Sequence, residues 1–153
     1  MPRATSAALA AATSVQPGGL VILVVEDDEA DAYLICRALT AHPAVGRVVR
    51  AVDGVEALEK VERGELAPDL AFIDLQMPRK GGLSLLTDLG ERAGRPFPMV
   101  VLTSSTAAVD AVRSRLSGAL RVVSKPETVE AMEAVLASAI DAVCPRAAVV
   151  PAG

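Results

Sequence analysis

The stretch that decides the fold is Asp69-Leu-Ala-Phe-Ile-Asp-Leu-Gln-Met-Pro78. Its residues 70–73 form a short continuous apolar run, which ends at Asp74 and is followed by a turn signal at Pro78. An apolar run of this length between breakers is typical of a strand buried on both faces of a sheet. Asp74 then lies at the carboxyl end of that strand, where open parallel α/β sheets bind their ligands. A lone carboxylate is costly to bury there, so its charge must be stabilised or used.

The segments on either side of this strand alternate between two hydrophobic patterns. Apolar runs predict further strands at residues 20–25, 47–52, 99–102 and 120–123, and the second of these is polar enough for a sheet edge. Helical spacing predicts helices at residues 29–40, 53–63, 83–89, 106–116 and 128–143, the third of which ends at Gly90 or Gly94. Asp53 is the expected N-cap of the second helix, with Glu56 three residues further on. Five alternating strands and helices predict an α/β fold with one doubly wound parallel sheet.

The composition of the chain argues against several classes of protein. The chain has 153 residues, 52% of them hydrophobic and 2% aromatic, and its net charge is −4. This length suits one domain, and the acidic balance argues against binding to nucleic acid. No apolar run reaches the roughly 18 residues of a membrane span. Cys36 and Cys144 have no metal-like or disulfide-like spacing, which favours a cytoplasmic protein.

The two ends of the chain differ in composition from its middle. Residues 1–19 are rich in Ala, Ser and Thr and end in Pro17-Gly-Gly19, and residues 144–153 contain two prolines. We expect a flexible N-terminal extension at 1–19, one domain at 20–143 and a flexible tail at 144–153. A signal peptide at the N-terminus is the weaker interpretation, because its apolar segment is short.

Polar residues interrupt the apolar runs where the predicted strands end. They are Glu26, Asp27, Asp28, Asp74, Thr103 and Lys125. The carboxyl ends of parallel strands share one edge of the sheet, so these side chains can meet in one crevice. Carboxylates that lie close together repel one another, and a hard divalent cation such as Mg²⁺ removes that conflict. The acids alone could equally be a solvated turn, whereas the whole set favours a site.

Acids, a cation, a lysine and a hydroxyl together suit a phosphoryl group. An aspartate carboxylate can be the nucleophile and form an aspartyl phosphate. A metal ion and a lysine then stabilise charge on the phosphoryl oxygens, which is most of what phosphoryl transfer requires. Thr103 supplies a hydroxyl that can bond one of those oxygens, although a turn or N-cap role is open for it as well.

Five motifs in this order and spacing resemble the response-regulator receiver domain of two-component signalling. They are VILVVEDD at 21–28, DGVEAL at 53–58, IDLQMP at 73–78, VVLTSS at 100–105 and VVSKP at 122–126. The resemblance covers about residues 20–143 and implies a flavodoxin-like sheet with strand order 2-1-3-4-5. EDDEAD at 26–31 and VVLTSS also resemble stand-alone receivers that are paired with phytochrome-type histidine kinases.

The resemblance assigns roles to individual residues. It implies that Asp74 is the phospho-acceptor, and that Asp27 and Asp74 bind Mg²⁺ directly together with the backbone carbonyl of Gln76. Glu26 would then act mostly through water, Thr103 would be the switch hydroxyl and Lys125 would pair with the phosphoryl group. A cis peptide bond is expected between Lys125 and Pro126.

Two positions depart from the family pattern. Where the family has Asp-Gly after the Met77-Pro78 turn, this chain has Gly81-Gly82. Where the family has an aromatic residue three positions before the lysine, this chain has Val122. The second departure puts the usual coupling between threonine and aromatic residue in doubt, whereas the phosphorylation chemistry is untouched.

The expected function is a single-domain response regulator that accepts a phosphoryl group on Asp74 from a sensor histidine kinase or phosphorelay protein. It would signal through altered contacts with a downstream protein, and a homodimer is an open alternative for such contacts. It would not be a metabolic enzyme. One alternative is a degenerate receiver that acts as a constitutive interaction module. The other is a haloacid-dehalogenase-like phosphatase, which needs a second aspartate where this chain has Gln76.

Overall fold

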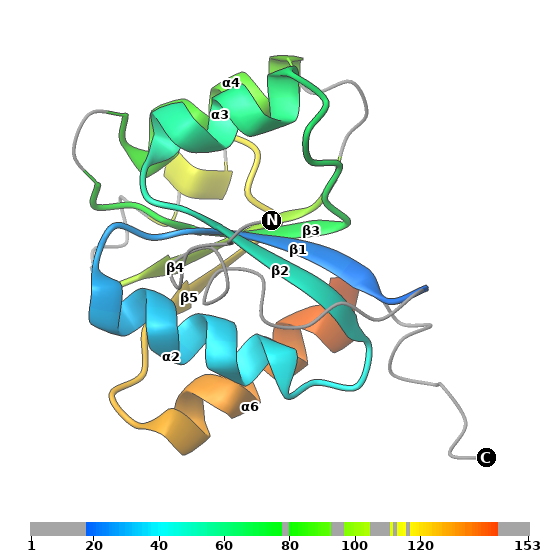
Figure 1. Cartoon of the computed structure of the whole chain (residues 1–153). Coiled ribbons are helices and arrows are strands. Elements are labelled where there is room, and N and C mark those ends of the chain that lie inside the picture. Colours follow the sequence, from blue (N-terminus) through cyan, green and yellow to red (C-terminus); the bar gives the residue numbers. More distant parts are fainter. Residues whose placement is uncertain are drawn as a thin grey trace.

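The structure is a computed structural model that describes residues 18–77, 80–92, 97–104, 111, 113–115 and 117–143 (Figure 1). The predicted extension and tail fall almost wholly on residues 1–17 and 144–153, outside the described residues. Most of the predicted helix at 106–116 also lies outside them, although residues 111 and 113–115 are described and helical.

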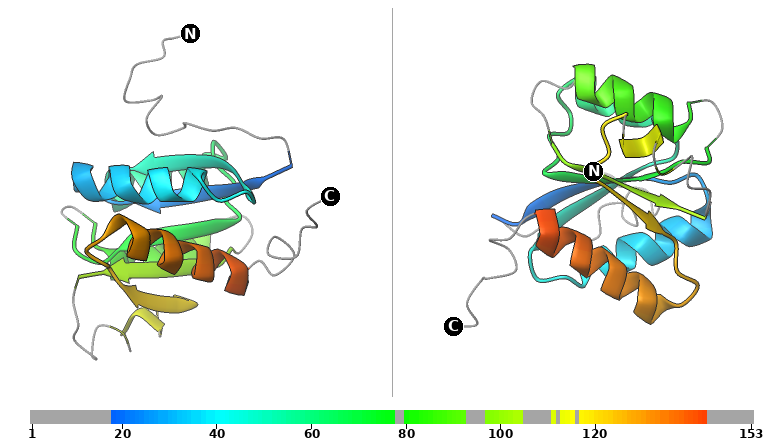
Figure 2. Two further views of the ribbon diagram at one scale, coloured as in Figure 1. Left: turned by 90° about the horizontal axis from the view of Figure 1, so that it is seen from below. Right: turned by 180° about the vertical axis from the view of Figure 1, so that it is seen from behind.

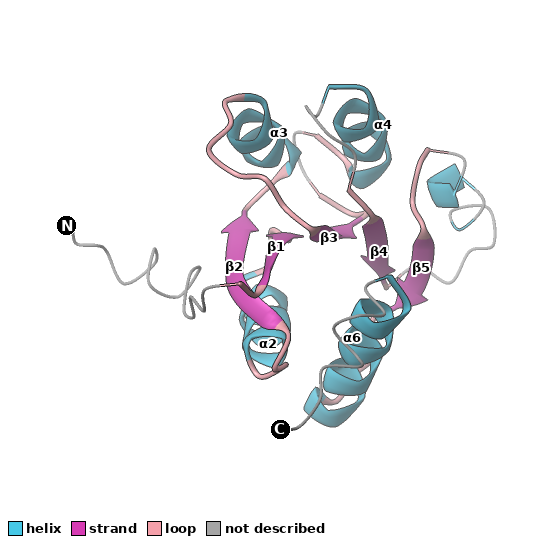
Figure 3. Ribbon diagram, turned by 90° about the vertical axis from the view of Figure 1, so that its right-hand side faces the viewer, coloured by secondary structure: helices cyan, strands magenta, loops and turns pink. Residues whose placement is uncertain are grey.

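Five parallel strands form a single sheet in the order β2-β1-β3-β4-β5, which confirms the predicted fold (Figure 3). The strands are β1 (Leu20–Val25), β2 (Val45–Ala51), β3 (Leu70–Asp74), β4 (Met99–Thr103) and β5 (Arg121–Ser124). The polar second strand is at a sheet edge, as predicted, and the wholly buried β3 is at the centre. Asp74 therefore lies at the carboxyl end of the central strand.

Helices cover both faces of this sheet. α3 (Gly54–Glu62) and α4 (Gly82–Arg92) lie on one face, and α2 (Glu29–Thr40) and α6 (Val129–Val143) lie side by side on the other (Figures 1 and 2). None of the described helices has the length and apolar character needed to span a membrane.

Alternation along the strands divides the core into two clusters. In β1, Leu23 and Val25 pack towards α3 and α4, whereas Ile22 and Val24 pack towards α2 and α6. Successive side chains of a strand point to opposite faces, so an apolar run supplies both clusters at once. Glu26 follows Val25, so by the same alternation it lies on the side of the sheet that α2 and α6 cover.

The start of α3 has the predicted N-cap, and the start of α2 is capped as well. The Asp53 carboxylate accepts a hydrogen bond from the Glu56 amide at 2.9 Å, and the Glu56 carboxylate accepts one from the Val52 amide at 2.6 Å. Asp28 caps α2 by accepting from the Asp31 amide at 2.8 Å. The bonds to Asp53 and Asp28 satisfy amides that the first turn of a helix leaves unpaired. Asp28 is thus used for local structure.

One open alternative is decided and one local expectation is wrong. Of the two expected ends of α4, Gly90 is excluded, because the helix continues through it to Arg92 and a single glycine weakens a helix without ending it. The peptide bond between Lys125 and Pro126 is trans, the isomer that X–Pro bonds favour unless the surroundings select cis.

Candidate functional site

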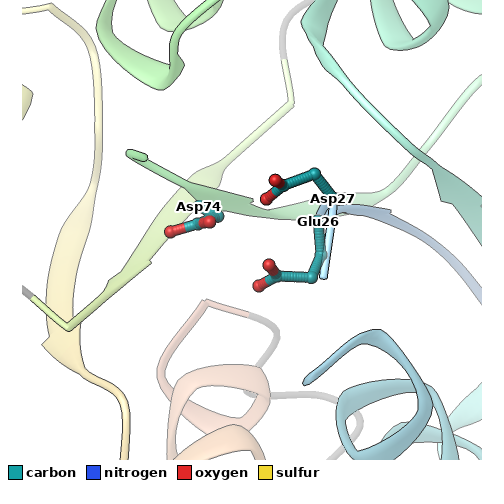
Figure 4. A group of neighbouring side chains, drawn as sticks. All are labelled: Glu26, Asp27 and Asp74. Carbon is teal, nitrogen blue, oxygen red and sulfur yellow. The ribbon is translucent and has the colours of Figure 1, made fainter. Parts of the chain in front are cut away.

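Three carboxylates meet at the carboxyl edge of the sheet, as the sequence predicted. Glu26 and Asp27 follow β1 and Asp74 ends β3, and Figure 4 shows the three side chains next to one another. One oxygen of each lies within 4.8 Å of the others, and Glu26 and Asp74 are only 1% and 5% exposed. Asp27 is exposed and opens the group to solvent. The arrangement concentrates acidic groups at a place where two of them are buried and the third faces solvent.

The backbone that carries Glu26 and Asp27 is held by Arg50, at the end of the neighbouring β2. The guanidinium donates to the Glu26 carbonyl at 2.9 and 3.0 Å and to the Asp27 carbonyl at 3.2 Å, and it pairs with Glu29 at 3.0 Å. A planar fork with several donors suits this task better than an ammonium group does. No pattern in the sequence signals this role, because it depends on where a long side chain turns after its strand ends.

The backbone around Asp74 is packed closely by glycine. A Cβ at Gly82 would lie 2.5 Å from the Asp74 carbonyl oxygen and 2.8 Å from the Leu75 Cα, so only glycine fits there. The Gln76 amide lies 3.3 Å from Asp74 Oδ1, to which it donates. The role expected for the Gln76 carbonyl stays a prediction.

Lys125 brings a positive charge into this group, as predicted. Its Nζ lies 2.8 Å from Glu26 Oε1 and 3.6 Å from Asp74 Oδ1, and it hydrogen-bonds Asp31 Oδ2 at 3.0 Å. The lysine amide also donates to the Thr103 carbonyl at 2.8 Å, which joins the ends of β4 and β5. Thr103 itself is buried one residue beyond Leu102, the register partner of Asp74. The ends of four strands therefore contribute to one place.

Burial and mutual repulsion perturb the acids. Burial raises the pKa of Glu26 to about 7 and is aided by the charge of Asp74, against the opposing effect of Lys125. Burial also raises the pKa of Asp74, again against Lys125. For Lys125, burial acts to lower the pKa, but Glu26, Asp31 and Asp74 outweigh it and hold the pKa above its ordinary value. Charge in this site is incompletely balanced by the protein.

The donor set fits a hard divalent cation. Glu26 Oε1 is buried and makes no hydrogen bond among the described residues, since the 2.8 Å approach of Lys125 is an ion pair without hydrogen-bond geometry. Carboxylate oxygens that converge beside an exposed edge are the ligands that such an ion takes, with water completing the shell. Glu26, Asp27 and Asp74 could thus hold a divalent metal ion.

Comparison with known proteins identifies the family of the chain. The sequence model of the response regulator receiver domain matches residues 22–137. The chain belongs to the response regulator receiver domain family.

Among curated relatives of this receiver domain, a protein-glutamate methylesterase/protein-glutamine glutaminase of Myxococcus xanthus is 36% identical over 119 residues, 76% of this chain and 33% of the relative. The sensor histidine kinase CheAY of Helicobacter pylori is 25% identical over 125 residues, 81% of this chain and 15% of the kinase. The receiver chain therefore spans a third or less of the length of these two relatives.

Solved receivers have the same fold. The phosphorylated cyanobacterial phytochrome response regulator RcpA matches with a TM-score of 0.73 and 25% identity, over 82% of this chain and 94% of RcpA. The receiver domain of a sensor histidine kinase from Pseudomonas aeruginosa, with a magnesium ion coordinated in its active site cleft, matches with a TM-score of 0.70 and 25% identity. That match covers 82% of this chain and 97% of the other.

Proposed function

We propose that Asp74 of this receiver accepts a phosphoryl group from a histidine kinase or a phosphorelay protein, in the presence of Mg²⁺. The observation that carries the proposal is the position of the Asp74 carboxylate, which lies among two further acids and 3.6 Å from the Lys125 ammonium. A carboxylate in such surroundings can be both nucleophile and metal ligand. The phosphorylated state of RcpA and the magnesium ion in the Pseudomonas receiver support the same interpretation.

In the reaction, an Asp74 carboxylate oxygen attacks the phosphorus of the donor. The new P–O bond forms as the bond from phosphorus to the donor nitrogen or oxygen breaks, and the electron pair leaves with the donor group. Glu26, Asp27, Asp74 and the Gln76 carbonyl would hold Mg²⁺, and the ion would supply positive charge that offsets the charge on the phosphoryl oxygens. Lys125 supplies a point charge on another side of the group, and the Thr103 hydroxyl donates to one of its oxygens.

Phosphorylation would act on partners through the segment from Thr103 to Lys125. Thr103 and Lys125 begin and end this segment, and Val122 within it packs against the cluster on the α3 side. Because a valine cannot make the inward turn of an aromatic side chain, we assign the signal to a shift of the segment after Thr103. The output is a changed contact with a downstream protein or a second copy. Because a kinase draws on ATP, we place the exchange in the cytoplasm.

A small phosphodonor tests the proposal without the kinase. Acetyl phosphate with Mg²⁺ should add one phosphoryl group to the parent and to Asp141→Asn, which removes an exposed acid from α6. Asp74→Asn, and the parent in the presence of a chelator, should remain unmodified. Intact-mass spectrometry measures all four. An unmodified parent with Mg²⁺ present would favour the constitutive interaction module instead.

A further inference from the structure

Asp31 contacts the catalytic lysine from an element that supplies none of the expected site residues. It lies in the first turn of α2, where its amide is fixed by the Asp28 cap at 2.8 Å. Its Oδ2 accepts a hydrogen bond from Lys125 Nζ at 3.0 Å, across 94 positions of sequence. The helix start therefore holds this carboxylate at a set distance from the end of β5.

The three carboxylates around Lys125 make different contacts with it. Glu26 lies at 2.8 Å without hydrogen-bond geometry, and Asp74 lies at 3.6 Å, beyond hydrogen-bond distance. Among the described residues, Asp31 alone accepts a hydrogen bond from this ammonium group. A charged hydrogen bond fixes direction, whereas an ion pair fixes only proximity. Asp31 thus directs one N–H of the ammonium, while Glu26 is its closest charged neighbour.

We propose that Asp31 is a positioning residue for phosphorylation of Asp74, an inference that rests on the proposed function. It takes one N–H of Lys125 and leaves two that can turn to the arriving phosphoryl oxygens. It also holds the ammonium close enough to Asp74 to stabilise charge, but off the carboxylate oxygen that must attack.

The need for such a residue follows from the chemistry of Lys125. A lysine ammonium is a point charge on a flexible stem, so its surroundings must direct it. Without Asp31, attraction draws it onto Asp74, where a direct hydrogen bond would occupy a lone pair of the nucleophile and make it less reactive. Misplacement of a catalytic group by about 1 Å can cost up to about a hundredfold in rate.

Three variants test the inference. Asp31→Ala removes the hydrogen bond, and Asp31→Glu keeps a carboxylate on a longer stem. Glu59→Ala is the control, because Glu59 carries the same charge and is exposed on α3, on the other face of the sheet. The rate of modification by acetyl phosphate is measured at saturating Mg²⁺ for the parent and each variant.

A second readout needs no phosphorylation. The chain has three lysines, so the side-chain ammonium signals in a ¹⁵N-labelled sample are few enough to assign. Exchange of the Lys125 ammonium protons with water is followed in the metal-free protein. Lys80, which pairs with Asp88 and donates to Ser84 Oγ at 3.0 Å, is the internal reference.

Asp31→Ala should slow phosphorylation about three- to tenfold and speed exchange at Lys125 alone. Asp31→Glu should restore part of both, and Glu59→Ala should resemble the parent. Equal rates in Asp31→Ala and Glu59→Ala, or a faster rate in Asp31→Ala, would overturn the inference, as would unchanged exchange at Lys125. In each of these results the parent is modified, so the proposed function stands. A parent that takes up no phosphoryl group would overturn both.

Discussion

Glu26 is a buried carboxylate whose charge the protein compensates only in part. Its pKa is about 7 in the folded protein against an ordinary value of 4.5, chiefly because burial disfavours the charged form. The folded state therefore holds this proton over a range of pH in which the unfolded state has lost it. Mg²⁺ favours the opposite, charged form, so metal and protons compete at this residue.

The raised pKa of Glu26 fixes the sign with which the free energy of unfolding depends on pH. Between about pH 4.5 and about 7 the folded state binds more protons at Glu26 than the unfolded state does. The free energy of unfolding of the metal-free parent should therefore rise as pH falls through this range, relative to Glu26→Gln. The shift at Asp74 acts in the same direction. Urea unfolding of both proteins at several pH values, with and without Mg²⁺, measures it.

Saturating Mg²⁺ should reverse this trend, because it stabilises the charged site at high pH. A contradicting result is that the free energies of unfolding of the parent and of Glu26→Gln differ by the same amount at every pH. That result would show that Glu26 remains charged throughout this range. It would also remove the reason to expect competition between metal and protons.

At the scale of the element, the start of α4 sets the shape of the loop beside Asp74. Gly81 and Gly82 are adjacent, yet a Cβ at Gly81 has no neighbour closer than 3.9 Å, whereas one at Gly82 meets the Asp74 carbonyl at 2.5 Å. The departure from the family at Gly81 therefore leaves open space, and the glycine shared with the family is the one that the packing requires.

These two glycines make a matched pair of alanine substitutions. Gly81→Ala should be neutral or stabilise by about 0.4–1 kcal/mol, because it removes freedom from the unfolded chain. Gly82→Ala should destabilise by about 1–3 kcal/mol, because the added methyl group displaces backbone at Asp74. Urea unfolding measures both. Equal effects would mean that the close approach at Gly82 relaxes without cost.

We expect phosphorylation to change the conformation of the segment from Thr103 to Lys125. Hydrogen exchange with and without beryllofluoride, a mimic of the phosphoryl group, should change most across residues 103–125. A modest free-energy difference of about 1–3 kcal/mol between states is enough for such a shift. Changes concentrated in residues 29–41 would place the output surface on α2 instead.

Most of the strands were predictable because they are apolar runs that end in polar residues, whereas β2 contains two arginines. The predicted Arg47 start of β2 and the observed start at Val45 differ by two residues, as strand ends commonly do. The roles of Arg50 and Asp31 depend on long-range contacts that no local pattern encodes.

At the scale of the whole molecule, the sheet brings residues from distant parts of the sequence to one edge. Strand order alone implies that the ends of β1, β3, β4 and β5 are neighbours, and so the acids, Thr103 and Lys125 are predictable as one group. Which oxygen faces which donor follows only from the packed side chains. The net charge of −4 and the acidic edge are consistent with a site that needs a cation.

The central claim is that, among the acids at this edge, Asp74 alone forms the new bond. Borohydride reduces an aspartyl phosphate to homoserine, so treatment after acetyl phosphate and Mg²⁺ marks the modified residue permanently. Peptide mass spectrometry should then find homoserine at position 74 and at no other aspartate. Homoserine at position 27 or elsewhere, or a reduced chain with every aspartate intact, would contradict the account.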